Sequence, residues 1–291
     1  MADTESRLLH FIHLTRLHKP VGTVLLLWPA LWALWLAAGG LPDLRLLAIF
    51  IAGGFVMRAA GCVINDYADR DFDAFVERTS YRPMATGKIQ PWEALVLFVA
   101  LSLCGLALVW MTNGLTVQYD LAGAAIISIY HFMKRYTHLP QLVLGIAWAW
   151  SIPMAFAAHT DAVPAAAWVL VLGVICWTLV FDTFYAMVDR DDDLKIGIKS
   201  TAILFGNYDL HIIALLQLAT LLCLIATGIN FGLGGLYYLG VVVVAALFGH
   251  QLYTARQRDR DGCFRAFMDN RWIGATLFVA IALDSLVARF T

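Results

Sequence analysis

Two short acidic segments of the sequence carry residue types that bind divalent cations. They read Asn-Asp-Tyr-Ala-Asp-Arg-Asp-Phe-Asp (65–73) and Asp-Arg-Asp-Asp-Asp (189–193). On a helix, Asn65, Asp69 and Asp73 share one face, as do Asp189 and Asp193, because residues four apart are neighbours. Like charges at this spacing repel each other. A divalent cation supplies the counter-charge that such carboxylates need.

The two segments together suggest chemistry on a diphosphate. Mg²⁺ prefers oxygen ligands, usually takes one or two carboxylates, and completes its coordination with water and substrate phosphates. Two separated acidic segments on one side of a protein therefore predict two metal sites that hold one diphosphate between them. The alternative is a pair of solvated acidic loops at a membrane surface, where carboxylates cost little.

Basic residues accompany each acidic segment. Arg70 lies within the first, and Arg78 and Arg82 follow it four residues apart. Arg190 lies within the second, and Lys195 and Lys199 follow it at the same spacing. Arginine binds phosphate oxygens at two points and lysine acts as a point charge. These residues are candidates for diphosphate contacts, although residues that only orient a membrane protein would occupy the same places.

Two further arginines are candidates for binding the carboxylate of an acceptor. Arg58 interrupts an apolar run one to two turns from its end, where a charged side chain usually faces a cavity or a partner. It also has the length to reach the membrane interface. Arg135 follows Lys134 at the end of another apolar run, where the pair serves either as a topology anchor or as an anion clamp.

The composition shows which elements must position these residues. Of the 291 residues, 61% are apolar and 14% are charged. Soluble proteins have about 25% charged residues. This chain therefore cannot cover a water-facing surface, which excludes a soluble enzyme, a nucleic-acid-binding protein and a disordered scaffold. It indicates an all-α polytopic membrane protein.

The apolar runs predict nine membrane-spanning helices in one domain of residues 1–291, capped by polar loops. A span needs about 20 mostly apolar residues. The expected spans are 21–38, 46–64, two within 94–133 separated at 112–114, 136–160, 162–181, two within 210–255 separated at 228–235, and 272–288.

The positions of the basic residues give this bundle an orientation. Seventeen of the 20 Lys and Arg residues precede the first span or follow an even-numbered one; Arg45 and Arg289 fall on the opposite side. The positive-inside rule then places the N-terminus and both acidic segments in the cytoplasm. Residues 1–20, with apolar positions separated by basic residues and histidines, predict an interfacial amphipathic helix.

The acidic segments also suggest an internal repeat. Asn65 and Asp189 are 124 residues apart, as are Asp69 and Asp193, and each segment follows an even-numbered span. We interpret this spacing as two four-helix units followed by one extra helix.

Four segments of the sequence resemble the UbiA-type intramembrane aromatic prenyltransferases. They are Met-Arg-Ala-Ala-Gly-Cys-Val-Ile-Asn-Asp-Tyr-Ala-Asp-Arg (57–70), Phe-Met-Lys-Arg-Tyr-Thr-His-Leu-Pro-Gln (132–141), Tyr-Ala-Met-Val-Asp-Arg-Asp-Asp-Asp (185–193) and Lys-Ile-Gly-Ile-Lys-Ser-Thr-Ala-Ile-Leu-Phe-Gly (195–206). The resemblance covers nearly the whole chain and is strongest to family members that act on 4-hydroxybenzoate in bacterial ubiquinone synthesis. Two departures are His131, where close members tend to have Pro, and Phe184, where Gln is usual.

The resemblance implies a nine-helix bundle with a lateral opening to lipid, in the bacterial inner membrane. It implies transfer of a polyprenyl group from a polyprenyl diphosphate to the ring of 4-hydroxybenzoate, ortho to the hydroxyl, with Mg²⁺ as cofactor. The family's metal-binding positions correspond to Asn65, Asp66, Asp69, Asp73, Asp189 and Asp193, and its diphosphate contacts to Arg70, Arg78, Arg82 and Lys195. Asp69, Asp73, Asp189 and Asp193 are the expected catalytic residues.

Three alternatives remain open from the sequence. One is a prenyltransferase of the same type for another aromatic acceptor. The second is a cation-coupled transporter, which would place ionisable residues near the bilayer midplane rather than at one surface. The third is a structural or assembly subunit, which has no use for two acidic motifs.

Overall fold

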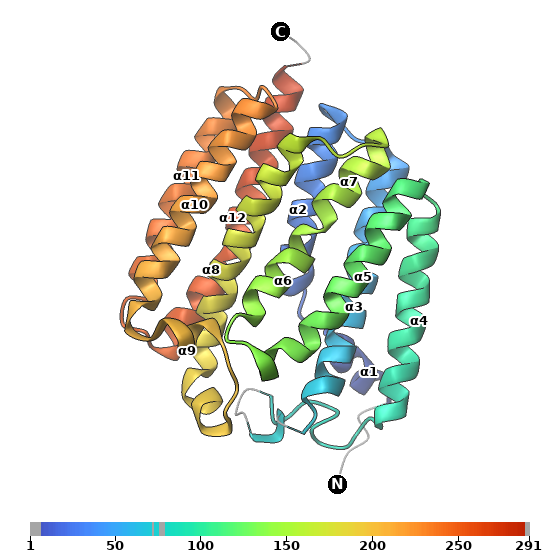
Figure 1. The fold of residues 1–291 in the computed structure, drawn as a ribbon, viewed down its shortest axis with the longest axis vertical. Helices are drawn as coiled ribbons and strands as arrows, with labels where there is room; N and C mark the ends of the chain where they lie inside the picture. Colours follow the sequence, from blue (N-terminus) through green and yellow to red (C-terminus); the bar gives the residue numbers. More distant parts are fainter. Residues whose placement is uncertain (1–6, 72, 76–78, 289–291) are drawn as a thin grey trace.

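The computed structural model describes residues 7–71, 73–75 and 79–288, and for 129–132, 134, 135 and 196 it describes the backbone alone. This part of the chain is helical throughout, without strands (Figure 1). The long helices are α2 (Val21–Ala38), α3 (Leu44–Asp69), α4 (Pro91–Trp110), α5 (Gly114–Tyr136), α8 (Ala165–Ile196), α10 (Asp209–Asn230), α11 (Gly235–Thr254) and α12 (Arg260–Val287). The shorter ones are α1 (Arg7–Thr15), η1 (Asp73–Phe75), α6 (Pro140–Ala149), α7 (Ser151–Thr160), α9 (Thr201–Phe205) and η2 (Gly206–Tyr208).

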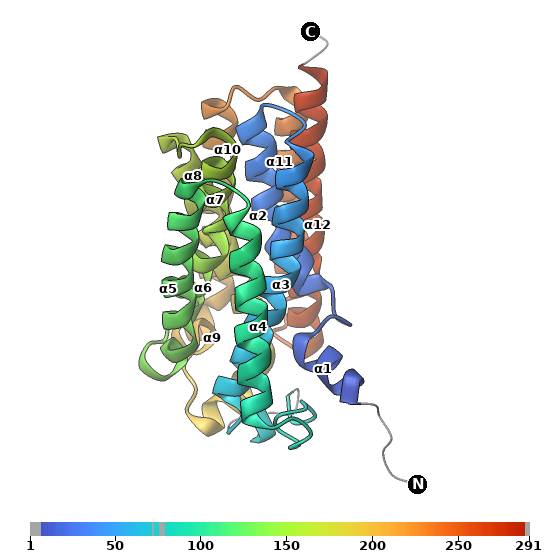
Figure 2. The same ribbon diagram turned by 90° about the vertical axis from the view of Figure 1, so that its right-hand side faces the viewer.

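The helices run side by side along one axis, as the two views in Figures 1 and 2 show. Eight helical segments of the described chain are long and apolar enough to cross a membrane, with 140–160 (α6 and α7) counted as one. Helix α5 stands among them in the bundle but is less apolar, since it carries Gln118 and Asp120. The all-α membrane bundle is confirmed, and the predicted count of nine is approximate because of α5.

Three helix boundaries differ from those that hydropathy suggests. Helix α12 begins at Arg260 rather than near Trp272, because the Asp259 side chain caps it by accepting a hydrogen bond from the Gly262 N–H at 2.9 Å. Helix α8 continues to Ile196, so that residues 189–193 form its last turns rather than a loop. The helix over 140–160 is interrupted at Trp150. The ring of Pro153 clashes with the carbonyl group of the residue four positions earlier, which breaks the helix there.

Two tryptophans at the centre of the bundle join α2, α8 and α12. The Trp32 and Trp177 ring centroids are 5.3 Å apart, and both side chains are buried. Trp32 donates its indole N–H to the Gly274 carbonyl at 3.1 Å, and Trp177 donates to Asn270 Oδ1 at 2.8 Å. These bonds satisfy the indole groups where no water is available.

The helix ends that carry the acidic segments meet at one end of the bundle, beside α1 and α9 (Figure 1). Buried Asp209 fixes this end: Arg190 of α8 donates to it at 2.5 Å and Arg258 at 2.8 Å. A buried carboxylate is tolerated when it is paired and hydrogen-bonded in this way. Helix α1 packs against α3 and buries Leu14. Its interfacial position and the four-helix repeat stay predictions.

Gly274 gives a test of how closely α2 and α12 approach. A Cβ at this position would lie 1.9 Å from Trp28 Cδ1, and Gly274→Ala must therefore push the helices apart. Overpacking of this kind costs about 1–3 kcal/mol, and we expect a lower midpoint temperature of unfolding in detergent, followed by tryptophan fluorescence.

The matched control is Gly249→Ala in α11, where an added Cβ meets no atom within 4 Å. Alanine there raises helix stability by about 0.5–1 kcal/mol. Equal midpoints for the two variants would contradict the close packing of α2 on α12.

Candidate active site

One cavity connects the acidic end of the bundle with its apolar interior. Its volume is about 640 Å³, and residues of α2, α3, α4, α5, α6, α7 and α8 line it. At the acidic end, both predicted segments reach its wall. The residues that they contribute are Asn65, Asp69, Asp73, Asp189 and Asp193. The structure thus brings together five of the six predicted metal-binding side chains.

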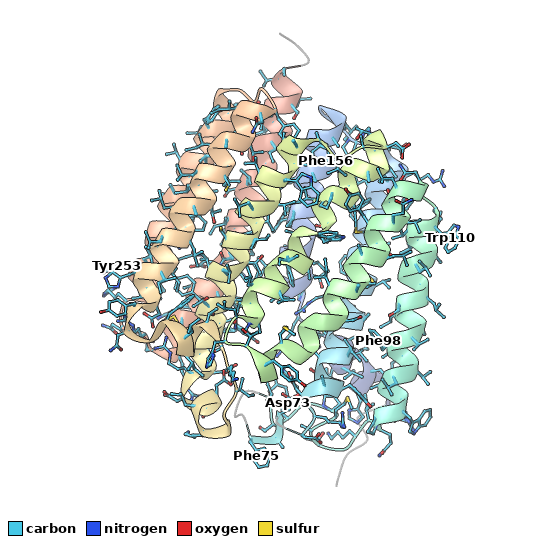
Figure 3. All side chains as sticks on the ribbon, in the orientation of Figure 1. Asp73, Phe75, Phe98, Trp110, Phe156 and Tyr253 are labelled. Atoms are coloured by element: carbon cyan, nitrogen blue, oxygen red, sulfur yellow. The ribbon has the colours of Figure 1, made fainter. Side chains whose placement is uncertain are left out.

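The first segment reaches the cavity from the last turns of α3 and from η1. Asp73 is 5% exposed and lies at the acidic end in Figure 3. Arg82 donates to both of its carboxylate oxygens, at 3.0 and 2.8 Å. Burial raises the pKa of Asp73; Arg82 opposes this shift, and the nearby Asp66 and Asp69 carboxylates reinforce it. Asp73 is therefore a buried carboxyl group that is paired with one arginine and has two further carboxylates nearby.

Asp66, the sixth predicted ligand, has a different position. It is 1% exposed, does not line the cavity, and forms ion pairs with Arg16 and with Arg82, the latter at 3.0 Å. Both arginines do line the cavity. Asp66 thus holds the guanidinium groups of Arg16 and Arg82 in the cavity wall. The sequence gives no signal for Arg16, whose place in the basic N-terminal segment suggests a topology role only.

The second segment reaches the cavity along one face of α8. Asp182, Tyr185, Asp189 and Asp193 line it at helical spacing. Asp182 was recognisable in the sequence, since it lies two turns before Asp189 on the same face. Helix α8 then ends at Gly197, whose φ of +73° reverses the chain.

The reversal at Gly197 separates the two lysines that follow the segment. Lys199 lines the cavity, and its Nζ donates to the Tyr136 carbonyl at 3.5 Å. Lys195 is not part of the cavity lining; its side chain is 73% exposed and pairs with Asp192 at 3.2 Å. Among these two candidates, the geometry places Lys199 rather than Lys195 beside the carboxylates.

The remaining predicted basic residues fall into three groups. Arg82 and Arg58 line the cavity. Arg70 does not; it lies over the Tyr67 ring, 4.6 Å from the centroid, and donates to the Tyr67 carbonyl at 2.7 Å. Arg78 lies outside the described residues, as does the side chain of Arg135, together with that of His131.

Arg58 is accommodated by a glycine on the facing helix. A Cβ at Gly22 of α2 would lie 2.4 Å from the Arg58 guanidinium, which therefore packs directly against the α2 backbone. Phe184, the other departure from the family pattern, is fully buried among apolar side chains and does not line the cavity.

Beyond the acidic end, the cavity walls are mostly apolar. Leu25, Leu106, Leu144 and Met154 line this part, with Phe181, Tyr185 and Trp148 between it and the carboxylates. The described residues contain no group of three His, Cys, Asp or Glu side chains close enough to hold a metal alone. Mg²⁺ takes few carboxylates and completes its coordination with phosphate oxygens and water. The cavity suits a ligand with an anionic head and an apolar tail.

Comparison with known proteins agrees with this chemistry. The sequence profile of the UbiA prenyltransferase family matches residues 26–280. The chain is 55% identical over 274 residues to the 4-hydroxybenzoate octaprenyltransferase of Alkalilimnicola ehrlichii, covering 94% of each chain. It is 54% identical over 284 residues to the enzyme of the same name from Aeromonas salmonicida, covering 98% of each.

Solved structures share the fold. A UbiA homologue from Aeropyrum pernix K1, solved in its apo form, superposes with a TM-score of 0.80 at 24% identity, over 90% of this chain and 98% of that one. A UbiA homologue from Archaeoglobus fulgidus, bound to GPP and Mg²⁺, superposes with a TM-score of 0.74 at 19% identity, over 96% and 99%. By its sequence over nearly its full length, this chain belongs to the UbiA prenyltransferase family.

Proposed function

We propose that this protein transfers a polyprenyl group from a polyprenyl diphosphate to 4-hydroxybenzoate, ortho to the ring hydroxyl, for ubiquinone synthesis. The observation that carries the proposal is that carboxylates of α3, η1 and α8 line one cavity, which they share with many apolar side chains. The 54–55% identity to 4-hydroxybenzoate octaprenyltransferases supports the donor and the acceptor. The site would lie at the cytoplasmic face of the bacterial inner membrane.

In this proposal, the two ends of the cavity bind the two ends of the donor. The diphosphate lies among Asp69, Asp73, Asp189 and Asp193, and the tail extends between the apolar walls. Mg²⁺, held by Asn65 and these four carboxylates, would neutralise charge on the diphosphate as the C–O bond breaks. Arg82, Arg16 and Lys199 lie in the same wall and hold the phosphate oxygens in place.

The wall next to the carboxylates protects the electrophile. Departure of the diphosphate leaves an allylic cation at the first isoprene unit. Phe181, Tyr185 and Trp148 line this region, where aromatic faces stabilise a cation and keep water away. The acceptor ring, activated by its hydroxyl, attacks this cation and then loses a proton.

We assign recognition of the acceptor carboxylate to Arg58, with Arg135 as the second candidate. Arg58 lines the cavity from α3, two turns before Asn65. A guanidinium presents two parallel donors to a carboxylate, and this interaction is strongest away from water. The backbone of Gly22 limits the directions in which Arg58 can move, so that the acceptor would bind in a fixed orientation.

The carboxylates at the acidic end of the cavity should be essential, whereas their exposed neighbours should not. Asp69→Asn and Asp189→Asn remove charge from the wall, and we expect prenylation of labelled 4-hydroxybenzoate to fall on the order of 100-fold or more. The matched controls are Asp71→Asn and Asp191→Asn, which change exposed residues of the same segments. Near-normal turnover by either wall variant would remove the acidic site from the mechanism.

The two lysines on either side of Gly197 should differ in the same way. Lys199→Gln should raise KM for the diphosphate donor, because Lys199 lines the cavity, whereas Lys195→Gln should leave it unchanged. Initial rates over a range of donor concentrations measure both. The reverse order would show that the chain after Gly197 has a different path in the working enzyme.

Proton and metal should compete at Asp73. Its raised pKa means that Asp73 takes up a proton at a higher pH than an ordinary carboxyl group. As the pH falls from about 7 to about 5, the Mg²⁺ concentration for half-maximal activity should therefore rise, and EDTA should abolish activity at either pH. In Asp73→Asn this concentration should vary less with pH. Activity that survives EDTA would contradict metal use.

A further inference from the structure

Asp120 is an ionisable side chain in the cavity wall that has no part in the proposed chemistry. Asp120 lies on α5, sixteen residues before Tyr136, whose carbonyl accepts a hydrogen bond from Lys199 at the acidic end. At 1.5 Å per residue this is about 24 Å along the bundle. Asp120 is therefore remote from the diphosphate and lies near the opposite end of the same cavity.

The face of α5 that carries Asp120 is held firmly toward the cavity. Thr116, Asp120, Gly123, Ala124 and Ile127 all line it at helical spacing. On either side of Asp120, Trp150 of the α6–α7 junction fixes α5: its indole N–H donates to the Tyr119 carbonyl at 2.7 Å, and its ring fills the space beside Gly123.

Further toward the outer end, Asn113 anchors the start of α5. It caps this helix by accepting from the Thr116 N–H at 2.9 Å and donates to the Ala157 carbonyl of α7 at 2.6 Å. In the part of the chain that the structure describes, no side-chain hydrogen bond or ion pair reaches the Asp120 carboxyl. Asp120 thus lines the chamber, and among the described residues no side chain pairs with its carboxyl group.

An unpaired carboxyl group in this position disfavours an apolar ligand. A hydrocarbon chain that passes over Asp120 would displace water from a carboxyl group and offer no hydrogen bond in return, which is costly whether or not the group is ionised. Thr112 and Thr116 add hydroxyl groups to the same region of the wall. The chamber is thus polar at both ends and apolar between them.

We propose that Asp120 forms a polar end wall of the donor chamber, which sets how many isoprene units the bundle accommodates and turns longer tails sideways into lipid. Asp120 would then be a specificity-determining residue for the donor. This inference rests on the proposed prenyl transfer. It also explains why α5 keeps a carboxyl group inside a membrane bundle, where such groups are usually functional.

The test is a donor series from two to eight isoprene units, with kcat/KM measured for each. In the wild-type protein, kcat/KM should rise with each added unit until the tail reaches Asp120, and then stay level. In Asp120→Leu the rise should continue for at least one more unit. We therefore compare the donor at which the wild-type plateau begins with the donor that is one unit longer. The ratio of kcat/KM for the longer donor to kcat/KM for the shorter one should be about threefold or more higher in Asp120→Leu than in the wild type. This ratio does not depend on how much protein is folded.

Two further variants give the comparison its controls. Asp120→Asn keeps a polar group and should retain the plateau. Gln118→Leu makes a similar polar-to-apolar change on an exposed part of α5 that does not line the cavity, and it should match the wild type. Identical profiles for Asp120→Leu and the wild type, or an equal change in Gln118→Leu, would overturn the inference. Failure of the wild type to prenylate 4-hydroxybenzoate with any donor would instead reject the proposed function.

Discussion

Charge balance around the converging carboxylates is the constraint on which the rest of the structure depends. Asp69, Asp73, Asp189 and Asp193 come from segments far apart in the sequence and face one cavity in a region of low dielectric. Repulsion between them is opposed within the protein by Arg82 and Arg16, and Asp66 holds both arginines. These ion pairs therefore allow the carboxylates to lie at one end of the bundle, while the cavity stays attractive to cations.

Much of the fold follows from hydropathy alone, because backbone groups in lipid must be satisfied within each helix. The break at 112–114 and the division of 210–255 near 228–235 are recognisable from polar and glycine residues. The start of α12 is not, since it depends on an aspartate cap thirteen residues before the apolar run. The apolar run within 94–133 also predicts α5, although α5 is less apolar than the other spans because one of its faces lines the cavity.

The sequence predicts those parts of the site in which regular helical spacing decides which side chains share a face. That rule places Asn65 with Asp69 and Asp189 with Asp193, as found in the cavity wall. It fails after Gly197, where the backbone enters the left-handed region and residues 195 and 199 cease to share a face. It also cannot find Arg16, whose position depends on how α1 docks on α3. Arg78 and Arg135 stay predictions.

Arg16 reaches the cavity from the N-terminal segment. Changes to this segment therefore affect the candidate active site, although the segment lies at the edge of the bundle. A purification tag placed just before α2, or a truncation up to the start of α2, would disturb the ion pair between Arg16 and buried Asp66 while every long helix stayed intact. The far end of α12 lies at the opposite end of the bundle, away from the cavity mouth (Figure 1). Affinity handles and reporter fusions therefore belong on the C-terminal side.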